Sequence, residues 1–216
     1  MMLPVTAPRS LKEKQRQERE ELILQAAEEV LAEKGYFETS VDEIAAKVGI
    51  AKGTVYLHFP SKEDLVVAIL ERNTRALVEL VEVTAAAAHS NREKLEAILQ
   101  VVYGGFFDPR KRQIMQLPYA VMNGSELRRV FVEKKGCMKE AWSRLAALIA
   151  SILEDGKVEG EFDNTIPTPV MLSAFFSLMS PRSFEHLNEN NQMPADEFVK
   201  HLARFYFKGI AVVQGE

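Results

Sequence analysis

Two short helical patterns meet at a glycine within residues 39–65, and this feature limits what the chain can fold into more than any other. The stretch is TSVDEIAAKVGIAKGTVYLHFPSKEDL. Its first pattern repeats apolar residues at helical spacing, and these are Val41, Ile44, Ala45 and Val48. Gly49 supplies a turn, after which a second short helix is expected to begin at Ala51 or Lys52 and to end at Phe59. Two short helices joined in this way are typical of a helix-turn-helix, whose second helix enters the major groove of DNA.

Serine residues mark where the helices of this region begin. Ser40 and Glu43 have the spacing of a capping box, in which the serine hydroxyl bonds the amide of the glutamate and the carboxylate reaches back. Ser61 and Asp64 repeat this spacing and predict the start of a third helix. Pro60 disfavours helical geometry in the residue before it, so the second helix is expected to stop there.

Helical geometry also assigns the two faces of the second helix. Val55 and Phe59 are four residues apart, and both should point toward the core. The side chains that are left nearer the DNA are Lys52, Gly53, Thr54, Tyr56 and His58. These are residue types that read groove edges or bind phosphates.

The charge of this region differs from that of the whole chain. Glu43 and Glu63 bracket a run without carboxylates, whereas the chain of 216 residues has a formal net charge of −4. The basic residues of the run are Lys47, Lys52, His58 and Lys62. A negatively charged chain that keeps acids away from one face is expected to bind an anion there. The alternative is an ordinary helical corner, because caps and glycine turns occur throughout helical proteins.

The run from Ile23 to Leu70 resembles the DNA-binding domain of the TetR (tetracycline-repressor-like) family. The resemblance begins with small and apolar residues of a first helix, Ile23, Ala26, Ala27, Val30 and Leu31, followed by Gly35-Tyr36 and Thr39-Ser40. It continues through Ile44-Ala45, Val48-Gly49-Ile50, Gly53-Thr54-Val55-Tyr56, His58-Phe59 and Ser61-Lys62-Glu63-Asp64-Leu65. It covers about the first third of the chain, while the remainder resembles the family in being helical and of suitable length.

This resemblance implies a division of roles among the DNA-binding residues. Lys52, Gly53 and Tyr56 match positions that approach base edges, and Thr39 or Ser40, Thr54, His58 and Lys62 match positions that hold phosphates. The chemistry agrees, because a lysine can donate to guanine O6 or N7 and a glycine lets the backbone come close. Two alternatives stay open: Tyr56 packs against the first helix, and His58 is a local cap.

The periodicity and the resemblance together predict an all-α fold, with a three-helix DNA-binding domain followed by a helical bundle. We expect a flexible arm and the start of the first helix in residues 1–20, the helix-turn-helix domain in 21–66, and ligand binding and dimerisation in 67–216. The arm ends near residue 10, and a charged, solvated extension of the first helix follows from Leu11 to Glu21. As an alternative, Arg9, Lys12, Lys14 and Arg16 touch phosphates or the minor groove.

Glycine, proline and apolar spacing divide the remainder into helices. A long helix leaves the DNA-binding domain and ends before a turn at residues 89–91, and another runs to Phe107 before a break at Asp108-Pro109. Further helices are predicted over about 112–122, 125–132, 136–156, 168–187 and 195–213.

The last two predicted helices are apolar over more surface than a lone helix needs. Their apolar residues are Val170, Met171, Ala174, Phe175, Leu178 and Met179 on one, and Phe198, Leu202, Phe205, Tyr206 and Ile210 on the other. In the family that the chain resembles, the corresponding pair packs against its copy, and two recognition helices held about 34–36 Å apart read a palindrome. A homodimer is therefore expected, with completion of a monomer core as the alternative reading of these residues.

The middle of the chain is expected to sense a small, mostly apolar effector, because an aromatic and methionine-bearing bundle can enclose an apolar pocket. The candidate lining residues are Tyr103, Phe106, Phe107, Met115, Met122, Met138, Trp142, Phe175 and Met179, with plain core packing as the alternative for each. Asn123, Gln116 and Arg182 are weaker polar candidates. Such an effector would release a repressor from its operator by linkage. The competing hypothesis is a DNA-binding protein controlled by a protein partner or by no ligand.

Other classes of function lack the residues they need. His58, His89, His186 and His201 are scattered without HExxH or CxxC spacing, and Cys137 has no evident catalytic partner, so no enzyme, metal or cofactor is expected. A lone cysteine cannot form an internal disulfide. No apolar run approaches the ~20 residues that span a bilayer, and the N-terminus has no signal-peptide core, so a cytoplasmic location without membrane contact is expected.

Overall fold

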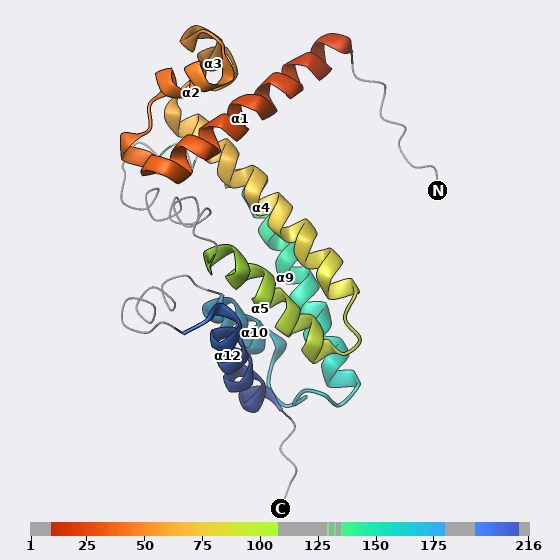
Figure 1. The fold of residues 1–216 in the computed structure, drawn as a ribbon. Helices are drawn as coiled ribbons and strands as arrows, with labels where there is room; N and C mark the ends of the chain where they lie inside the picture. Colours follow the sequence, from red (N-terminus) through yellow and green to blue (C-terminus); the bar gives the residue numbers. More distant parts are fainter. Residues whose placement is uncertain (1–9, 108–128, 130–131, 133–134, 180–192, 212–216) are drawn as a thin grey trace, which may run out of the picture. The chain divides into compact units, whose positions relative to one another are not determined.

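The computed structural model describes residues 10–107, 129, 132, 135–179 and 193–211, and the chain is all-α as the sequence predicts. The helices of these residues are α1 (Leu11–Glu38), α2 (Val41–Val48), α3 (Lys52–His58), α4 (Lys62–Ala86), α5 (Asn91–Phe107), α9 (Lys135–Val158), α10 (Thr168–Leu178) and α12 (Ala195–Ile210) (Figure 1). An isolated β-bridge joins Phe162 to Ala211. None of the described helices is both long and apolar enough to cross a lipid bilayer.

Most predicted helices are found, and one ends early. The helix predicted over 168–187 is wrong at its end, because α10 stops at Leu178 and the carbonyl of that residue accepts a hydrogen bond from the Tyr103 hydroxyl. The last helix stops at Ile210, since Ala211 is already extended. The helices predicted over 112–122 and 125–132 lie outside the described residues, apart from the helical residues 129 and 132.

The chain divides into two compact units, of which the first contains Met1–Leu70 and the second takes up the chain at Glu71. We call residues 10–70 the head. In the head α1 packs on α2, and α2 packs on α3. The apolar residues expected on the inner side of α1 are all buried, and they are Ile23, Ala26, Ala27, Val30 and Leu31. This burial fixes the platform that carries α2 and α3.

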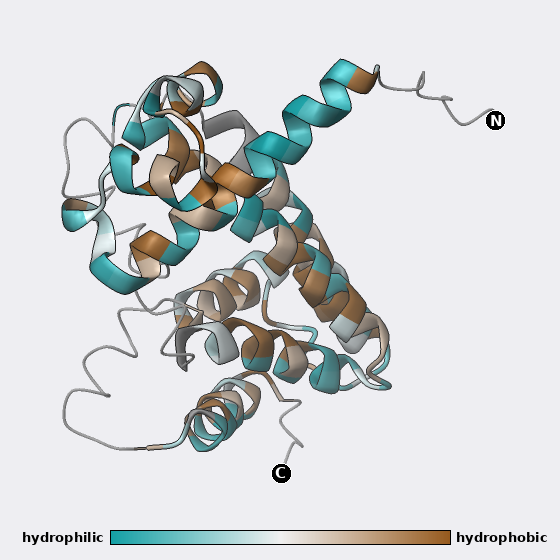
Figure 2. Cartoon of the chain, turned by 45° about the horizontal axis from the view of Figure 1, so that its top comes forward, coloured by the Kyte–Doolittle hydropathy of each residue, from teal (hydrophilic) through white to brown (hydrophobic). Residues whose placement is uncertain are grey.

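The start of α1 carries a local signal that the sequence analysis overlooked. Ser10 accepts a hydrogen bond from the Glu13 amide at 3.2 Å, and the Glu13 carboxylate accepts one from the Ser10 amide at 2.8 Å. This complete capping box places the first residue of α1 at Leu11. The following turns are exposed and hydrophilic, so the predicted solvated extension is confirmed (Figure 2). The predicted flexible arm, residues 1–9, lies outside the described residues.

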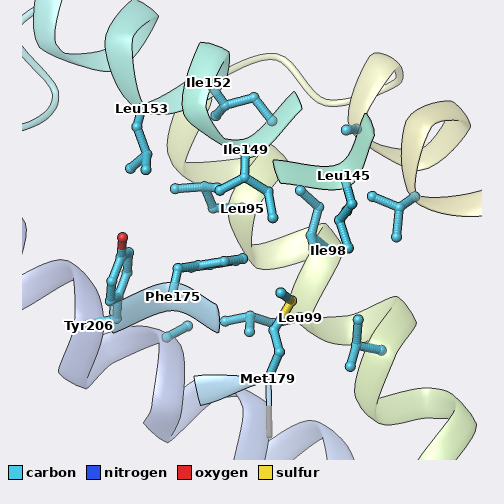
Figure 3. Close-up of a cluster of buried hydrophobic side chains, with 14 of the residues drawn as sticks. Leu95, Ile98, Leu99, Leu145, Ile149, Ile152, Leu153, Phe175, Met179 and Tyr206 are labelled. Carbon is cyan, nitrogen blue, oxygen red and sulfur yellow. The ribbon is translucent and has the colours of Figure 1, made fainter. Parts of the chain in front are cut away.

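The second unit is held by an apolar core in which helices far apart in the sequence meet. α5 packs on α9 and α12, and α9 packs on α10. Figure 3 shows side chains of this core: Leu95, Ile98 and Leu99 of α5, Leu145, Ile149, Ile152 and Leu153 of α9, Phe175 of α10 and Met179 directly after it. All are nearly or completely buried, so this core is the main source of stability for the unit.

A carboxylate from the loop after α9 caps the start of α5. Glu161 accepts hydrogen bonds from the amide of Asn91 at 3.0 Å, from its side-chain nitrogen at 2.9 Å and from the amide of Arg92 at 3.1 Å. Glu159 also accepts from the Asn91 side chain at 2.9 Å. Asn91 is only 1% exposed, so these bonds satisfy polar groups that water does not reach.

The apolar residues of the closing helix pair mostly complete the core of their own chain, which corrects their assignment to a dimer face. The buried members are Met171, Phe175, Met179, Phe198, Tyr206 and Ile210. The Tyr206 hydroxyl donates to the carbonyl of Met171 at 2.8 Å, so α12 and α10 are also joined by a hydrogen bond. Val170 and Phe205 stay 57% and 75% exposed, and Ala174 is exposed as well.

Candidate nucleic-acid interface

The turn between α2 and α3 depends on Gly49, whose φ of 77° lies in the left-handed region that favours glycine. The Gly49 amide donates to the carbonyl of Ala46 at 3.2 Å, and the Ile50 amide donates to that of Ala45 at 3.0 Å. This pattern is a Schellman motif, which satisfies the last carbonyls of a helix. The predicted glycine turn is therefore confirmed, and the chain leaves α2 in a fixed direction.

Two buried residues set the orientation of α3. Val55 and Phe59 are 1% and 8% exposed, as the sequence predicts. Lys52 and Gly53 are exposed, and Tyr56 keeps 41% of its surface in contact with solvent. The three residues expected at base edges therefore share the accessible side of a short, rigidly seated helix.

The sequence analysis missed Leu57, which is 80% exposed. At about 100° per residue, Leu57 lies roughly 200° around the helix from Val55, almost opposite the buried side. The spacing that turns Val55 inward also turns Leu57 outward, so the signal was present in the sequence.

Ser40 caps α2 but does not complete the predicted capping box. Its hydroxyl oxygen accepts a hydrogen bond from the Glu43 amide at 3.3 Å. The Glu43 carboxylate instead forms an ion pair with Lys34 of α1. The start of α2 is therefore fixed to α1 by a contact that local spacing does not reveal.

Acidic residues from neighbouring segments reach the basic run, which corrects the expectation of a face without carboxylates. Lys52 Nζ lies 2.6 Å from Oδ2 of Asp42, and Lys47 Nζ lies 2.9 Å from Oε2 of Glu29. Both acids lie before Glu43 in the sequence, outside the run that lacks them. Both ammonium groups thus have a carboxylate partner within the chain, and any external anion would have to compete with it.

His58 has an acidic partner on the extension of α1. Its Nδ1 lies 3.1 Å from Oε1 of Glu20, which also accepts a hydrogen bond from Nε of Arg16 at 3.0 Å. Partial burial favours a higher pKa for Glu20, but the bonds from His58 and Arg16 outweigh it and the pKa is lowered. The exposed start of α1 therefore holds the last residue of α3 in place.

Lys62 begins α4 next to an aromatic ring. Its ammonium group lies 4.3 Å from the ring centroid of Tyr36, and partial burial lowers the pKa of Lys62. The Tyr36 hydroxyl donates to Glu63 at 2.5 Å. The predicted cap of this helix is present, because Ser61 accepts a hydrogen bond from the Asp64 amide at 3.0 Å.

The two threonines predicted to hold phosphates differ in access. Thr39 is 4% exposed and its hydroxyl donates to the carbonyl of Gly35 at 2.7 Å, which favours exposed Ser40 for this role. Thr54 is half-buried, and its amide donates to the carbonyl of Ala51 at 2.8 Å.

The candidate effector residues are only partly described. Tyr103 and Phe175 are completely buried, Met179 is 8% exposed and Trp142 is 43% exposed. Burial raises the pKa of Tyr103 to about 12, and its hydroxyl bonds the end of α10, so core packing accounts for this residue. Met115 and Met122, like the weaker candidates Gln116, Asn123 and Arg182, lie outside the described residues, as do the side chains of Phe106, Phe107 and Met138.

Comparison with known proteins identifies relatives of the head and of the whole fold. Residues 23–69 match the family described as bacterial regulatory proteins, tetR family. The fatty acid metabolism regulator protein of Bacillus subtilis (strain 168) is 27% identical over 139 residues, which cover 64% of this chain and 68% of that protein. The transcriptional activator FasR of Mycolicibacterium smegmatis is 38% identical over 93 residues, 43% of this chain and 41% of that protein.

Solved structures extend the likeness to the second unit. FadR from Bacillus subtilis in complex with stearoyl-CoA has a TM-score of 0.70 at 22% identity, and the match covers 88% of this chain and 98% of that one. A putative regulator from Saccharomonospora viridis in complex with choline has a TM-score of 0.73 at 20% identity, covering 91% of this chain and 100% of that one. At such identities the structures establish the fold, and their different ligands do not carry over.

Proposed function

Because the chain belongs to the tetR family of bacterial regulatory proteins and is a regulator of transcription, not an enzyme, we propose that it represses genes from a palindromic operator. It binds this operator as a homodimer and leaves it when a small, mostly apolar effector binds. The observation that carries the proposal is the accessible side of α3, where Lys52, Gly53 and Tyr56 are exposed while Val55 is buried.

The roles of these residues follow from their chemistry. Lys52 donates to guanine O6 or N7, and Tyr56 lies beside it at the base edges. Ser40, Thr54, His58 and Lys62 donate to phosphate oxygens and fix the register of the head on the duplex, with Thr39 supporting the loop before Ser40.

A dimer is proposed because α3 has seven residues, which reach few base pairs. Two such helices about 34–36 Å apart would read successive major-groove faces of a palindrome. Val170, Ala174 and Phe205 support this step, because they remain exposed on α10 and α12 when the rest of the predicted set is buried or partly buried.

The effector is proposed to be mostly apolar because the buried side chains of the second unit are mostly apolar. Among its described residues, the buried polar side chains are Asn91 and Thr168, and the others are apolar. The first compound to test is a long acyl thioester, because FadR was solved with stearoyl-CoA and another relative is named a fatty acid metabolism regulator. Linkage requires that the effector bind more tightly to a state with low operator affinity. We assign α4 to this coupling, since the boundary between the two units falls within it.

Selection of bound sequences from a random duplex pool tests the DNA-binding proposal. The expected product is a palindrome whose half-site centres are about one helical turn, or a multiple of it, apart. Recovery of no sequence above background, with no binding to any duplex at low ionic strength, would refute the proposal. A reporter gene behind the selected operator then separates repression from the activation named for FasR.

Titration of the operator complex with stearoyl-CoA, and separately with choline, tests the effector class. The acyl thioester is expected to lower operator affinity and to raise the melting temperature of the free protein by mass action. Choline serves as the polar, cationic comparison. Unchanged operator affinity at saturation with every compound tried would favour the second candidate, a regulator controlled by a protein partner or by no ligand.

A further inference from the structure

Leu57 is the most exposed large apolar side chain of the head. A single leucine on a surface is normal and requires no explanation by itself. Its place on the molecule is what matters, because Leu57 stands on the recognition helix almost opposite Val55. A side chain in this position points away from the core of the head.

Gly53 lies on the same face as Leu57, one helical turn earlier. A Cβ atom added to Gly53 would meet no atom within 4 Å, so the fold of the chain does not require a glycine there. Glycine weakens a helix relative to alanine, and an exposed glycine without an internal reason points to an external surface that comes close. Leu57 and Gly53 thus form a shallow apolar step on the outer side of α3.

We propose that this step is a binding site for the C5-methyl group of a thymine in each operator half-site. The inference rests on the proposed function, because it assigns a base to the same helix. Thymine alone presents a methyl group in the major groove, whereas the other bases present only donors and acceptors there. A leucine pressed against those polar groups would remove their water and return no hydrogen bond. Leu57 therefore favours thymine and disfavours the other bases.

The length of α3 relates this thymine to the guanine assigned to Lys52. Leu57 follows Lys52 by five positions, and at 1.5 Å per residue the two lie about 7.5 Å apart along the helix axis. Successive base pairs are 3.4 Å apart, so the thymine is expected about two base pairs from the guanine.

The test replaces each thymine of the selected operator, one symmetric pair at a time, with deoxyuridine. Uracil pairs as thymine does and lacks only the methyl group. For the unaltered protein, one pair of replacements is expected to weaken binding by about fourfold per half-site, the value for burial of one methyl-sized group. The other replacements are expected to change affinity little.

Leu57→Ala is expected to bind the thymine operator as weakly as the unaltered protein binds the uracil operator, and to lose its sensitivity to uracil. Leu57→Met keeps a long apolar side chain at this position and should keep the sensitivity to uracil replacement. Leu22→Ala, which shortens another exposed leucine of the head, is the matched control and should behave as the unaltered protein. Because Leu57 is exposed, these variants are expected to fold normally, and circular dichroism verifies this.

Two results would overturn the inference while leaving the proposed function intact. One is a selected palindrome in which every uracil replacement is neutral. The other is a uracil penalty of equal size in Leu57→Ala and in the unaltered protein, which would place the methyl group against another residue. Failure of the unaltered protein to select any sequence would instead refute the proposed function.

Discussion

The ammonium group of Lys52 lies 2.6 Å from Oδ2 of Asp42, so the cation assigned to a base edge already has an anionic partner within the chain. Asp42 belongs to the first turn of α2 and Lys52 opens α3, so the pair connects the two helices of the helix-turn-helix. The bond to Asp42 raises the pKa of Lys52, which keeps the ammonium group charged. DNA that engages Lys52 must therefore replace Asp42.

Asp42→Asn is expected to tighten operator binding by about two- to threefold, because an exposed ion pair is weak and its loss frees Lys52 at little cost. The measurement is a cycle of four affinities with Asp42→Asn, Lys52→Ala and the double variant. Asp42→Asn should increase operator affinity less when Lys52 is replaced by alanine than when Lys52 is present. An equal gain in both backgrounds would show that Asp42 repels phosphates directly and does not act through Lys52.

Lys52→Ala and Lys62→Ala are expected to differ in their effects on binding. Lys52→Ala should mainly relax base preference, whereas Lys62→Ala should weaken binding to all duplexes and lower the salt slope by about one unit. Titrations of selected and scrambled operator at several salt concentrations measure both effects. Lys200→Ala, which removes an exposed lysine of α12, controls for the change in net charge. Equal losses on the two duplexes for both variants would contradict the assignment.

Gly53→Ala is expected to make the protein more stable and a poorer DNA binder. The added methyl group meets nothing in the free chain and strengthens the helix by about 0.5–1 kcal/mol, which raises the melting temperature by about 1–4 °C. On DNA the same methyl group stands between the backbone and the base edges. Gly104→Ala is the matched control, since its Cβ is also unobstructed and it lies in α5. Stabilisation without loss of affinity would place Gly53 away from the groove.

Sequence alone predicted the features of the head that depend on neighbours along the chain. Gly49, Pro60 and the apolar spacing around Val55 act within one or two turns, so the ends of α2 and α3 fall within one residue of where the patterns place them. Ser10 and Glu13 carry the same kind of signal, and it was overlooked.

Contacts between distant segments could not be predicted in this way. His58 contacts Glu20, which lies 38 positions earlier in the chain. The residues next to His58 in the sequence include no carboxylate, and they do not indicate that α1 supplies one. The early end of α10 coincides with a hydroxyl from Tyr103, 75 positions before Leu178. The effector residues stay predictions, because spacing alone does not distinguish a pocket wall from a core side chain.

Glu161→Gln is expected to lower the free energy of unfolding by about 1–3 kcal/mol at neutral pH, because Asn91 and Arg92 lose a charged acceptor. Burial favours a higher pKa for Glu161, but these hydrogen bonds outweigh it and the pKa lies below the ordinary 4.5. A lowered pKa stabilises the folded state above pH 4.5, and this contribution is lost as the pH falls through the folded value. Urea unfolding from pH 7 to pH 3 should therefore show the difference between the two proteins shrink.

Glu159→Gln is the control for this pH effect, since Glu159 accepts a hydrogen bond from the Asn91 side chain, whereas Glu161 also accepts from the amides of Asn91 and Arg92. Glu159→Gln should lower the free energy of unfolding by less than Glu161→Gln does. A difference between Glu161→Gln and the unaltered protein that is as large at pH 3 as at pH 7 would show that the cost comes from packing and not from the charge.

Gly156→Ala is expected to destabilise the second unit, although alanine suits a helix better than glycine does. The added Cβ would lie 2.3 Å from Cδ2 and Cε2 of Phe162, a separation that atoms do not adopt. Phe162 is 2% exposed and its ring stacks on Phe207 with centroids 6.2 Å apart, so it cannot move without disturbing a second ring. Overpacking of this kind costs about 1–3 kcal/mol, which exceeds the helical gain of about 1 kcal/mol at most.

A cycle with Phe162→Leu separates the clash from other effects of Gly156→Ala. Leucine at residue 162 removes Cε2, and its Cδ atoms can rotate away from the new methyl group, so Gly156→Ala should cost much less in that background. Urea unfolding of the four proteins gives the coupling between the two sites. Gly156→Ala could instead lower the free energy of unfolding equally with phenylalanine or leucine at residue 162. That result would place the strain at the Gly156 carbonyl, which accepts hydrogen bonds from the amides of Glu161 and Phe162.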